Sequence, residues 1–369
     1  MASGGIFCAT KFCGDGSCLT NLPAAGFSPD ADKNLFAGTS AGNSLDGTSG
    51  CFNIFLGECS GKNVTSGACN TFIGVYAGGS GTVTGNCNIA MGQCALKHLT
   101  TGNLNIAIGK DAGCCLTNAS HNIFLGWQAG SNITSDSSQI AIGKKAGSVN
   151  AGYQNIFLGT YAGCGGTSGS YNVFFGKQAA PMNTGSDGIF IGCRAGNCNT
   201  GASNIFIGAC AGYDNTSGAS NIFIGKSAGK EITTAGDNIM IGRSVAASSA
   251  TTACSNIVMG LESGYNMGAA CNSVMIGTQA GCDVTGHCNV FLGYQAGTNV
   301  TSGCNNIFLG SCAGGVCAVT GNNNIAMGCL SGKKLTSGTA NVFIGDRAGC
   351  NISSESGNTF IGGRAGQYS

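Results

Sequence analysis

Cysteine is the residue type in this chain best suited to chemistry, and its 23 copies fall at recurring positions. Seven of them stand one or two residues before the start of a repeated phrase: Cys51, Cys69, Cys87, Cys254, Cys271, Cys288 and Cys304. If the repeats stack like the strands of a sheet, cysteines at one position of neighbouring repeats would lie about 5 Å apart, within the Cα range of a disulfide. The best candidates for such stacking are Cys254, Cys271, Cys288 and Cys304. The alternative is that cysteine only fills small, half-buried positions, as alanine or serine would.

Other chemistry has little support in the sequence. No CxxC pair is present and His98, His121 and His287 are scattered, so a metal site is disfavoured. Gly225-Lys226-Ser227 imitates the end of a phosphate-binding loop, but the glycine that this motif needs at position 220 is a serine. The few acidic residues follow no repeating position, which disfavours a glycosidase pair and a calcium-binding roll. We therefore predict no catalytic residues, no metal and no cofactor.

The elements that would position these cysteines come from one short phrase, Asn-Ile-Phe-Ile-Gly-x-x-Ala-Gly, which occurs twenty times between Asn34 and Gly366. Successive phrases start 16 to 19 residues apart. A repeat this short cannot bury its own apolar face, and stacking of the repeats completes the core. We predict an all-β fold, a parallel β-solenoid (β-roll) of about twenty coils over residues 34–369, preceded by a cap or connector segment at 1–33.

Each coil is numbered here from its asparagine as position one. Position five is glycine in every repeat and position nine in all but three, as a corner with positive φ requires. The apolar run at positions two to four predicts a short strand that pairs with the strands of neighbouring coils. Position one is asparagine in seventeen repeats, which predicts a ladder of stacked amides. Its members include Asn53, Asn70, Asn88, Asn105, Asn122, Asn204, Asn221 and Asn238.

A second strand is expected at positions twelve and thirteen, where an apolar residue often precedes threonine, as in Val64-Thr65 and Ile133-Thr134. Twenty coils at ~4.8 Å per coil predict a rod on the order of 95 Å long.

The apolar strand also predicts an assembly, because side chains alternate between two faces and both faces are apolar. One face can fill the interior, but the other would expose an apolar stripe larger than a soluble monomer tolerates. We expect this stripe to meet other copies of the chain in a bundle of parallel rods. The spacing alone does not separate a dimer from a homotrimer, which is the preferred count. The phenylalanines of position three are assigned to this interface: Phe55, Phe72, Phe124, Phe157, Phe174, Phe190, Phe206, Phe223, Phe291, Phe308, Phe343 and Phe360.

Composition limits the partners. Charged residues make up 8% of the chain and the net charge is +1, so nucleic-acid binding is disfavoured. The apolar residues are too regularly interrupted for membrane insertion. The first residues contain no apolar stretch long enough for a secretory signal, which favours synthesis in the cytosol followed by use in an extracellular filament or a virion appendage.

Two phrases carry a family resemblance. Asn272-Ser273-Val274-Met275-Ile276-Gly277 resembles the NSVAIG phrase of trimeric autotransporter adhesin heads, in which three β-rolls pack about one axis. Gly14 to Leu22 resembles the GDGSGLTNL phrase near the start of viral tail-fibre and adhesin shafts, with Cys18 in place of a glycine. The resemblance implies a trimer. The chain differs from a complete autotransporter because it shows no signal peptide, heptad stalk or membrane-anchor barrel.

The sequence therefore predicts a non-enzymatic structural fibre, a trimeric solenoid that stacks head to tail into a filament. The last phrase is a full repeat, so its open end could bind the N-terminal segment of the next rod, with Cys8, Cys13 and Cys18 available for bonds between subunits. An alternative is the shaft of a viral tail fibre or adhesin that binds a cell-surface receptor. A minor alternative is an ice-binding solenoid, because threonine recurs at position thirteen.

Overall fold

A computed structural model of the chain describes residues 29–47, 49–149, 152–166, 168–249, 252–315 and 317–367. Cys8, Cys13, Cys18, the Gly14–Leu22 phrase and nearly all of the predicted 1–33 segment lie outside the described residues. Within the described part, every regular element is a three-residue strand. The strands are β1 (Leu35–Ala37), β2 (Ile54–Leu56), β3 (Thr71–Ile73), β4 (Ile89–Met91), β5 (Ile106–Ile108), β6 (Ile123–Leu125), β7 (Ile140–Ile142), β8 (Ile156–Leu158), β9 (Val173–Phe175), β10 (Ile189–Ile191), β11 (Ile205–Ile207), β12 (Ile222–Ile224), β13 (Ile239–Ile241), β14 (Ile257–Met259), β15 (Val274–Ile276), β16 (Val290–Leu292), β17 (Ile307–Leu309), β18 (Ile325–Met327), β19 (Val342–Ile344) and β20 (Thr359–Ile361).

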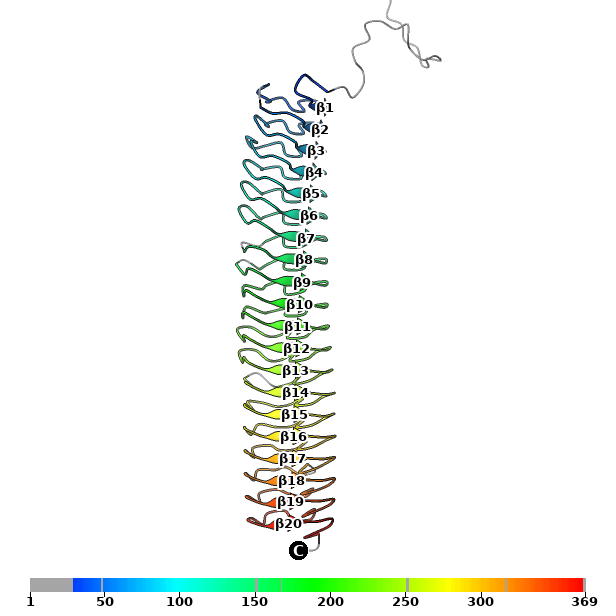
Figure 1. Cartoon of the computed structure of the whole chain (residues 1–369), viewed down its shortest axis with the longest axis vertical. Coiled ribbons are helices and arrows are strands. Elements are labelled where there is room, and N and C mark those ends of the chain that lie inside the picture. Colours follow the sequence, from blue (N-terminus) through cyan, green and yellow to red (C-terminus); the bar gives the residue numbers. More distant parts are fainter. Residues whose placement is uncertain are drawn as a thin grey trace, which may run out of the picture.

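These strands form one parallel sheet in which each strand pairs with the next strand in the chain. The pairing joins equivalent positions, for example Phe206 with Phe223. The coils therefore stack in chain order into a long rod, in which the strands follow one another in a single column (Figure 1). This confirms the predicted all-β solenoid of twenty coils.

The predicted second strand does not form. Among the described residues, only one isolated bridge, between Val64 and Val83, occurs outside the twenty strands. The apolar residues of position twelve are nonetheless buried, including Leu99, Ile133 and Leu335. Positions twelve and thirteen form turns that lie against the core, and they do not form a strand. Their backbone makes only isolated hydrogen bonds to the next coil, such as that from Thr117 N–H to the Thr134 carbonyl oxygen (2.9 Å).

Two glycine positions set the shape of the coil. At position five, Gly208 has φ of 138°, and a Cβ there would lie 2.4 Å from the Gly225 carbonyl oxygen of the next coil. At position nine, a Cβ on Gly212 would lie 2.5 Å from the Phe206 ring of its own coil. Glycine at position nine therefore leaves room for the phenylalanine at position three. The coil of β4 reverses this arrangement, because it has Ala90 at position three and a buried Leu96 at position nine.

The phenylalanine column lies inside the rod, so its predicted role at a subunit interface is wrong. Eleven of the twelve side chains are at most 3% exposed in the single chain, and Phe360 packs against the same core from the last coil. Where phenylalanines occupy adjacent coils their rings contact one another, as the stacked rings of Phe206 and Phe223 do with centroids 4.8 Å apart. The corrected residues are Phe55, Phe72, Phe124, Phe157, Phe174, Phe190, Phe206, Phe223, Phe291, Phe308, Phe343 and Phe360.

The asparagines of position one form a buried ladder. The Asn238 backbone N–H and side-chain amide both donate to Asn221 Oδ1, each at 3.1 Å. Asn221 Nδ2 in turn donates to the Ala235 carbonyl across its own coil, at 3.0 Å. The donation from a backbone N–H to the preceding asparagine Oδ1 also joins the successive residues Asn53, Asn70, Asn88, Asn105 and Asn122. An amide such as that of Asn221 thus links two coils and also closes its own coil.

The ladder is interrupted at Gly188, which has no side chain to offer to Asn204. Asn204 Nδ2 donates instead to Asn199 Oδ1 (3.0 Å), and Asn199 Nδ2 donates to Asn183 Oδ1 (2.6 Å). Asn183 and Asn199 occupy position twelve, which is apolar in most coils. A third asparagine follows at position twelve of the next coil, Asn215, and it is fully buried.

Asn215 provides a prediction about stability. Its side-chain nitrogen and oxygen have no hydrogen-bond partner among the described residues, and an unsatisfied buried amide costs about 1–3 kcal/mol. We expect Asn215→Leu to raise the free energy of unfolding by about that amount, measured by urea denaturation. Asn199→Leu is the matched control, because its amide is bonded on both sides, and it should destabilise the protein. A loss of stability in Asn215→Leu would show that the amide is satisfied in solution.

Candidate functional site

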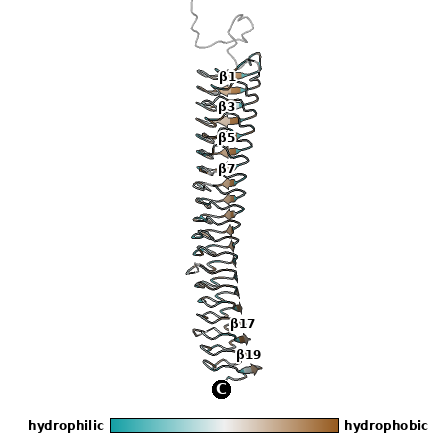
Figure 2. Cartoon of the chain, turned by 90° about the vertical axis from the view of Figure 1, so that its left-hand side faces the viewer, coloured by the Kyte–Doolittle hydropathy of each residue, from teal (hydrophilic) through white to brown (hydrophobic). Residues whose placement is uncertain are grey.

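The side of the sheet that faces away from the core is apolar along the whole rod. It consists of the residues at positions two and four of each coil, which are the first and last residues of each strand, and we call it the outer face. Two positions in each of twenty strands give forty residues, of which only Thr71 and Thr359 are polar. None of the forty is buried, because positions two and four alternate with the buried position three. Figure 2 shows the apolar strands following one another down the rod.

The outer face is partly exposed to solvent: fourteen of its forty residues are exposed and the other twenty-six are half-buried. In the middle of the rod Phe175 is 54% exposed and Ile108 is 41% exposed. The face contains no charged residue. Its forty positions exceed the roughly 20–30 residues that each partner contributes to a standard protein interface. A surface of this size can bind a long apolar partner, and it has no group that could activate a nucleophile or hold a metal ion.

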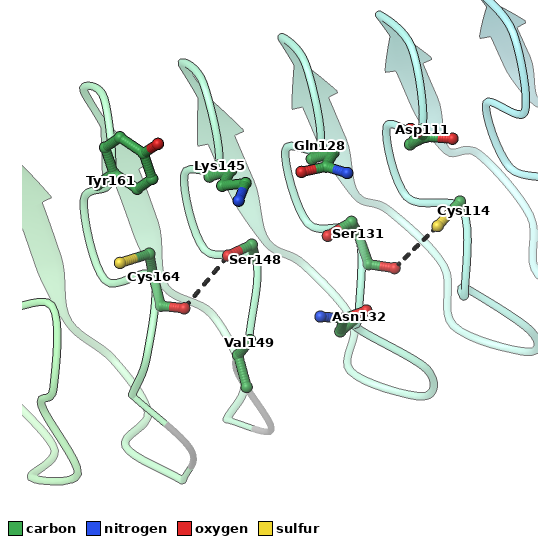
Figure 3. Close-up of a pocket in the computed structure, with 10 residues that line it drawn as sticks. All are labelled: Asp111, Cys114, Gln128, Ser131, Asn132, Lys145, Ser148, Val149, Tyr161 and Cys164. Atoms are coloured by element: carbon green, nitrogen blue, oxygen red, sulfur yellow. Dashed lines mark hydrogen bonds between the residues drawn. The ribbon is translucent and has the colours of Figure 1, made fainter.

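A second feature is a groove of about 590 Å³ along the turns of the coils that contain β5–β8, which we call the edge groove (Figure 3). Asp111, Gln128, Lys145 and Tyr161 form one row, at position seven of successive coils. A second row, at position ten of the same coils, consists of Cys114, Ser131, Ser148 and Cys164. These side chains are small, which leaves the groove open. Asn132 and Val149 complete the lining.

Two lysine amines lie beside the groove between aromatic rings. The Lys144 Nζ is 4.7 Å from the Trp127 ring centroid and 5.6 Å from that of Tyr161. The corresponding distances for Lys145 are 5.7 and 5.9 Å. Cation–π contacts of this kind orient the amines but are worth only about 0.5–1 kcal/mol at an exposed site. The arrangement is suited to weak contact with an anion or a sugar rather than to catalysis.

The Cys114 thiol in the edge groove is not an activated nucleophile. Burial, followed by the neighbouring Cys115 thiol, raises the pKa of Cys114 to about 12. The Cys114 thiol also donates to the Ser131 carbonyl at 3.2 Å (Figure 3). Because the thiolate is the reactive form, Cys114 is unreactive at neutral pH.

We expect this pKa to control alkylation. At pH 8 iodoacetamide should modify Cys114 at least about 100-fold more slowly than an ordinary exposed thiol, because the thiolate fraction falls tenfold for each unit of pKa. Exposed Cys193 is the internal control, with both rates followed by peptide mass spectrometry. The Cys114 rate should keep rising with pH up to about 12. Equal rates at pH 8 would contradict the burial of this thiol.

The cysteines predicted to stack are only partly joined. Cys254 and Cys271 form a disulfide with a Cα–Cα distance of 4.7 Å, whereas Cys288 and Cys304 are free thiols. The reason is their position in the coil. Cys254, Cys271 and Cys304 are each the second residue before position one of a coil. In the coil between those of Cys271 and Cys304, His287 occupies this place, and Cys288 is instead the first residue before position one.

This second position before the asparagine forms a ladder that sequence reasoning missed. Where the residue at this position has a side-chain acceptor, that acceptor can bind the backbone N–H of the same position in the preceding coil. Cys271 N–H donates to His287 Nδ1 (3.1 Å), and His287 N–H donates to Cys304 Sγ (3.3 Å). Elsewhere Asn86 N–H donates to Asn103 Oδ1 (2.7 Å). The signal in the sequence is the frequent Ser, Asn, Cys or His at this position, whose common property is a side-chain acceptor, although four coils have Ala or Gly there.

Further chemistry is not organised in the described part of the chain. There, no group of three or more His, Cys, Asp or Glu side chains is placed to hold a metal ion. No helix in that part is long and apolar enough to cross a membrane. The single ion pair of that part joins Lys230 to Glu231 at 3.9 Å. No known protein-family model matches the chain, and a comparison with curated proteins finds no match.

Proposed function

We propose that the protein is a non-enzymatic structural fibre, in which parallel copies of the rod pack through their outer faces around a common axis. The outer face is the observation that supports this proposal, because forty aligned positions without a charge would otherwise remain in water. Soluble monomers rarely expose apolar patches larger than a few hundred Å². The rod then contributes length and stiffness to the assembly.

The proposed occupant of the outer face is another copy of this chain. A partner must be straight, apolar and on the order of 95 Å long, given twenty coils at ~4.8 Å. A second copy meets these requirements, and its strand spacing matches that of the first along the whole face. Three copies are preferred because of the resemblance to trimeric adhesin heads at Asn272–Gly277. End-to-end stacking of such bundles would make the filament.

Light scattering and negative-stain electron microscopy of the full chain test the proposal. We expect a mass of three times 36.4 kDa and straight rods or filaments. A mass of twice 36.4 kDa would retain the assembly and correct the copy number. A stable monomer at tens of micromolar would overturn the proposal, and discrete short bundles at high concentration would remove the filament from it.

The second candidate is a fibre shaft that binds a receptor. The edge groove favours it, because Trp127 is 43% exposed beside the Lys144 and Lys145 amines. Binding of an acidic oligosaccharide that is lost in Trp127→Ala, with the assembly unchanged, would support this function. The ice-binding alternative is weaker, because threonine hydroxyls of position thirteen donate to carbonyls of the next coil, as Thr117 does to Thr134 (2.9 Å).

A further inference from the structure

The disulfide between Cys254 and Cys271 indicates which cysteine pairs this fold can join. Both residues occupy the same position in adjacent coils, so the parallel, in-register stacking places their Cα atoms 4.7 Å apart. That distance lies within the range that a disulfide allows. Because every coil stacks in the same way, two cysteines at one position of any adjacent pair of coils lie at about the same spacing.

Among the twenty cysteines within the described residues, this rule selects one further pair, Cys69 and Cys87. Each is the residue immediately before a position-one asparagine, Asn70 or Asn88. Other cysteines in adjacent coils are offset, as Cys193 and Cys210 are at positions six and seven. Cys59 and Cys94 share position seven, but the coil of Tyr76 lies between them.

The local structure of Cys69 and Cys87 supports a direct contact. Their backbones have almost the same conformation, with φ of 59° and 57°, so the two Cα–Cβ bonds leave equivalent points of the stack. Both residues are exposed, so an oxidant in solution can reach both thiols. Desolvation, followed by the nearby Cys87 and Cys51 thiols, raises the pKa of Cys69.

We propose that Cys69 and Cys87 are an oxidation site, where a small-molecule disulfide such as oxidised glutathione installs a covalent staple between the coils of β3 and β4. One protein thiolate attacks a glutathione sulfur, forming a mixed disulfide and releasing one glutathione thiolate. The second protein thiolate then attacks the protein sulfur of that mixed disulfide and releases the second glutathione thiolate. Two protein thiols are oxidised and one glutathione disulfide is reduced to two thiolates, which take up through solvent the two protons that the protein thiols released.

The staple would act where a solenoid opens most easily. Each coil contacts only its neighbours, so coils near an end separate at a lower free-energy cost than coils in the middle. The coils of β3 and β4 lie near the first coil of the described rod (Figure 1). A disulfide between the coils of β3 and β4 limits the separation of coils from that end. The disulfide between Cys254 and Cys271 joins the coils of β14 and β15 in the same way.

The test exposes the full chain to oxidised glutathione at pH 8.5, where more of each thiol is ionised. Remaining thiols are blocked with N-ethylmaleimide, and peptides are mapped by mass spectrometry without reductant. We expect one linked peptide pair containing Cys69 and Cys87, two hydrogen masses lighter than the reduced pair, alongside the pair of Cys254 and Cys271. In Cys69→Ser, Cys87 should instead retain one glutathione.

Cys193 and Cys210 are the matched internal control, because they lie in adjacent coils at different positions and should stay unlinked. Hydrogen exchange gives a second measurement, in which amides of β2–β4 should exchange at least several-fold more slowly after oxidation in the wild type but not in Cys69→Ser. The proposal is overturned if Cys69 and Cys87 are both alkylated after Cys254 and Cys271 have been oxidised. A preferred link from Cys69 to Cys51, or to another chain, would also overturn it.

Discussion

Replacing Ile207 and Ile224 with glutamate should convert the proposed assembly into single rods. Both side chains lie on the outer face, at position four of their coils, where they are the last residues of β11 and β12. Burying an uncompensated charge costs several kcal/mol per ion, so two per subunit should weaken association by at least about a thousandfold. Light scattering should then report 36.4 kDa, and the far-ultraviolet circular dichroism should be unchanged because the core is intact.

The control places the same charge elsewhere on the same two coils. Ser217 and Thr234 are exposed residues in the turns of these coils, outside the twenty strands, so Ser217→Glu with Thr234→Glu should leave the assembly as in the wild type. If the outer-face variant retains the mass of the wild type, the outer face is not the contact surface. If both variants dissociate, added charge rather than its location is responsible.

Removing one ring from the core should have a large effect on stability. Phe206 is fully buried and contacts Phe223 and Phe190, with ring centroids 4.8 and 5.5 Å away. Truncating a buried phenylalanine to alanine typically costs about 3–5 kcal/mol through lost burial and the remaining cavity. We expect Phe206→Ala to unfold at a lower urea concentration and to increase hydrogen exchange in β10–β12, since solenoid stability is a sum over neighbouring coils.

Ile207→Ala tests the alternation of the two faces. It removes a side chain from the adjacent position, but on the outer face, so it should affect association more than the stability of the single rod. Phe206→Ala should do the reverse. Dissociation of Phe206→Ala at unchanged stability would place the phenylalanine column at the interface and contradict its burial in the single chain.

The sequence by itself determined the solenoid, its coil number and its asparagine ladder. These features depend on strict local requirements: a glycine such as Gly208 must adopt a positive φ, and Asn221 must supply both an acceptor and a donor at a fixed position. Such requirements recur in every coil, so they appear in the sequence as columns. The repeat length then gives the order of the strands, because each coil can pair only with its neighbours.

Only the tertiary structure decided which face of the strand is inside. Ile205-Phe206-Ile207 is apolar on both faces, so alternation alone does not assign an interior. The ring of Phe206 turns inward because Gly212, without a side chain, leaves space beside it. The tertiary structure also decided which cysteines are joined. Cys288 is one residue out of line with Cys254 and Cys271, and it remains a free thiol. Spacing along the chain gives the period, whereas contact across coils depends on the direction in which each side chain leaves the backbone.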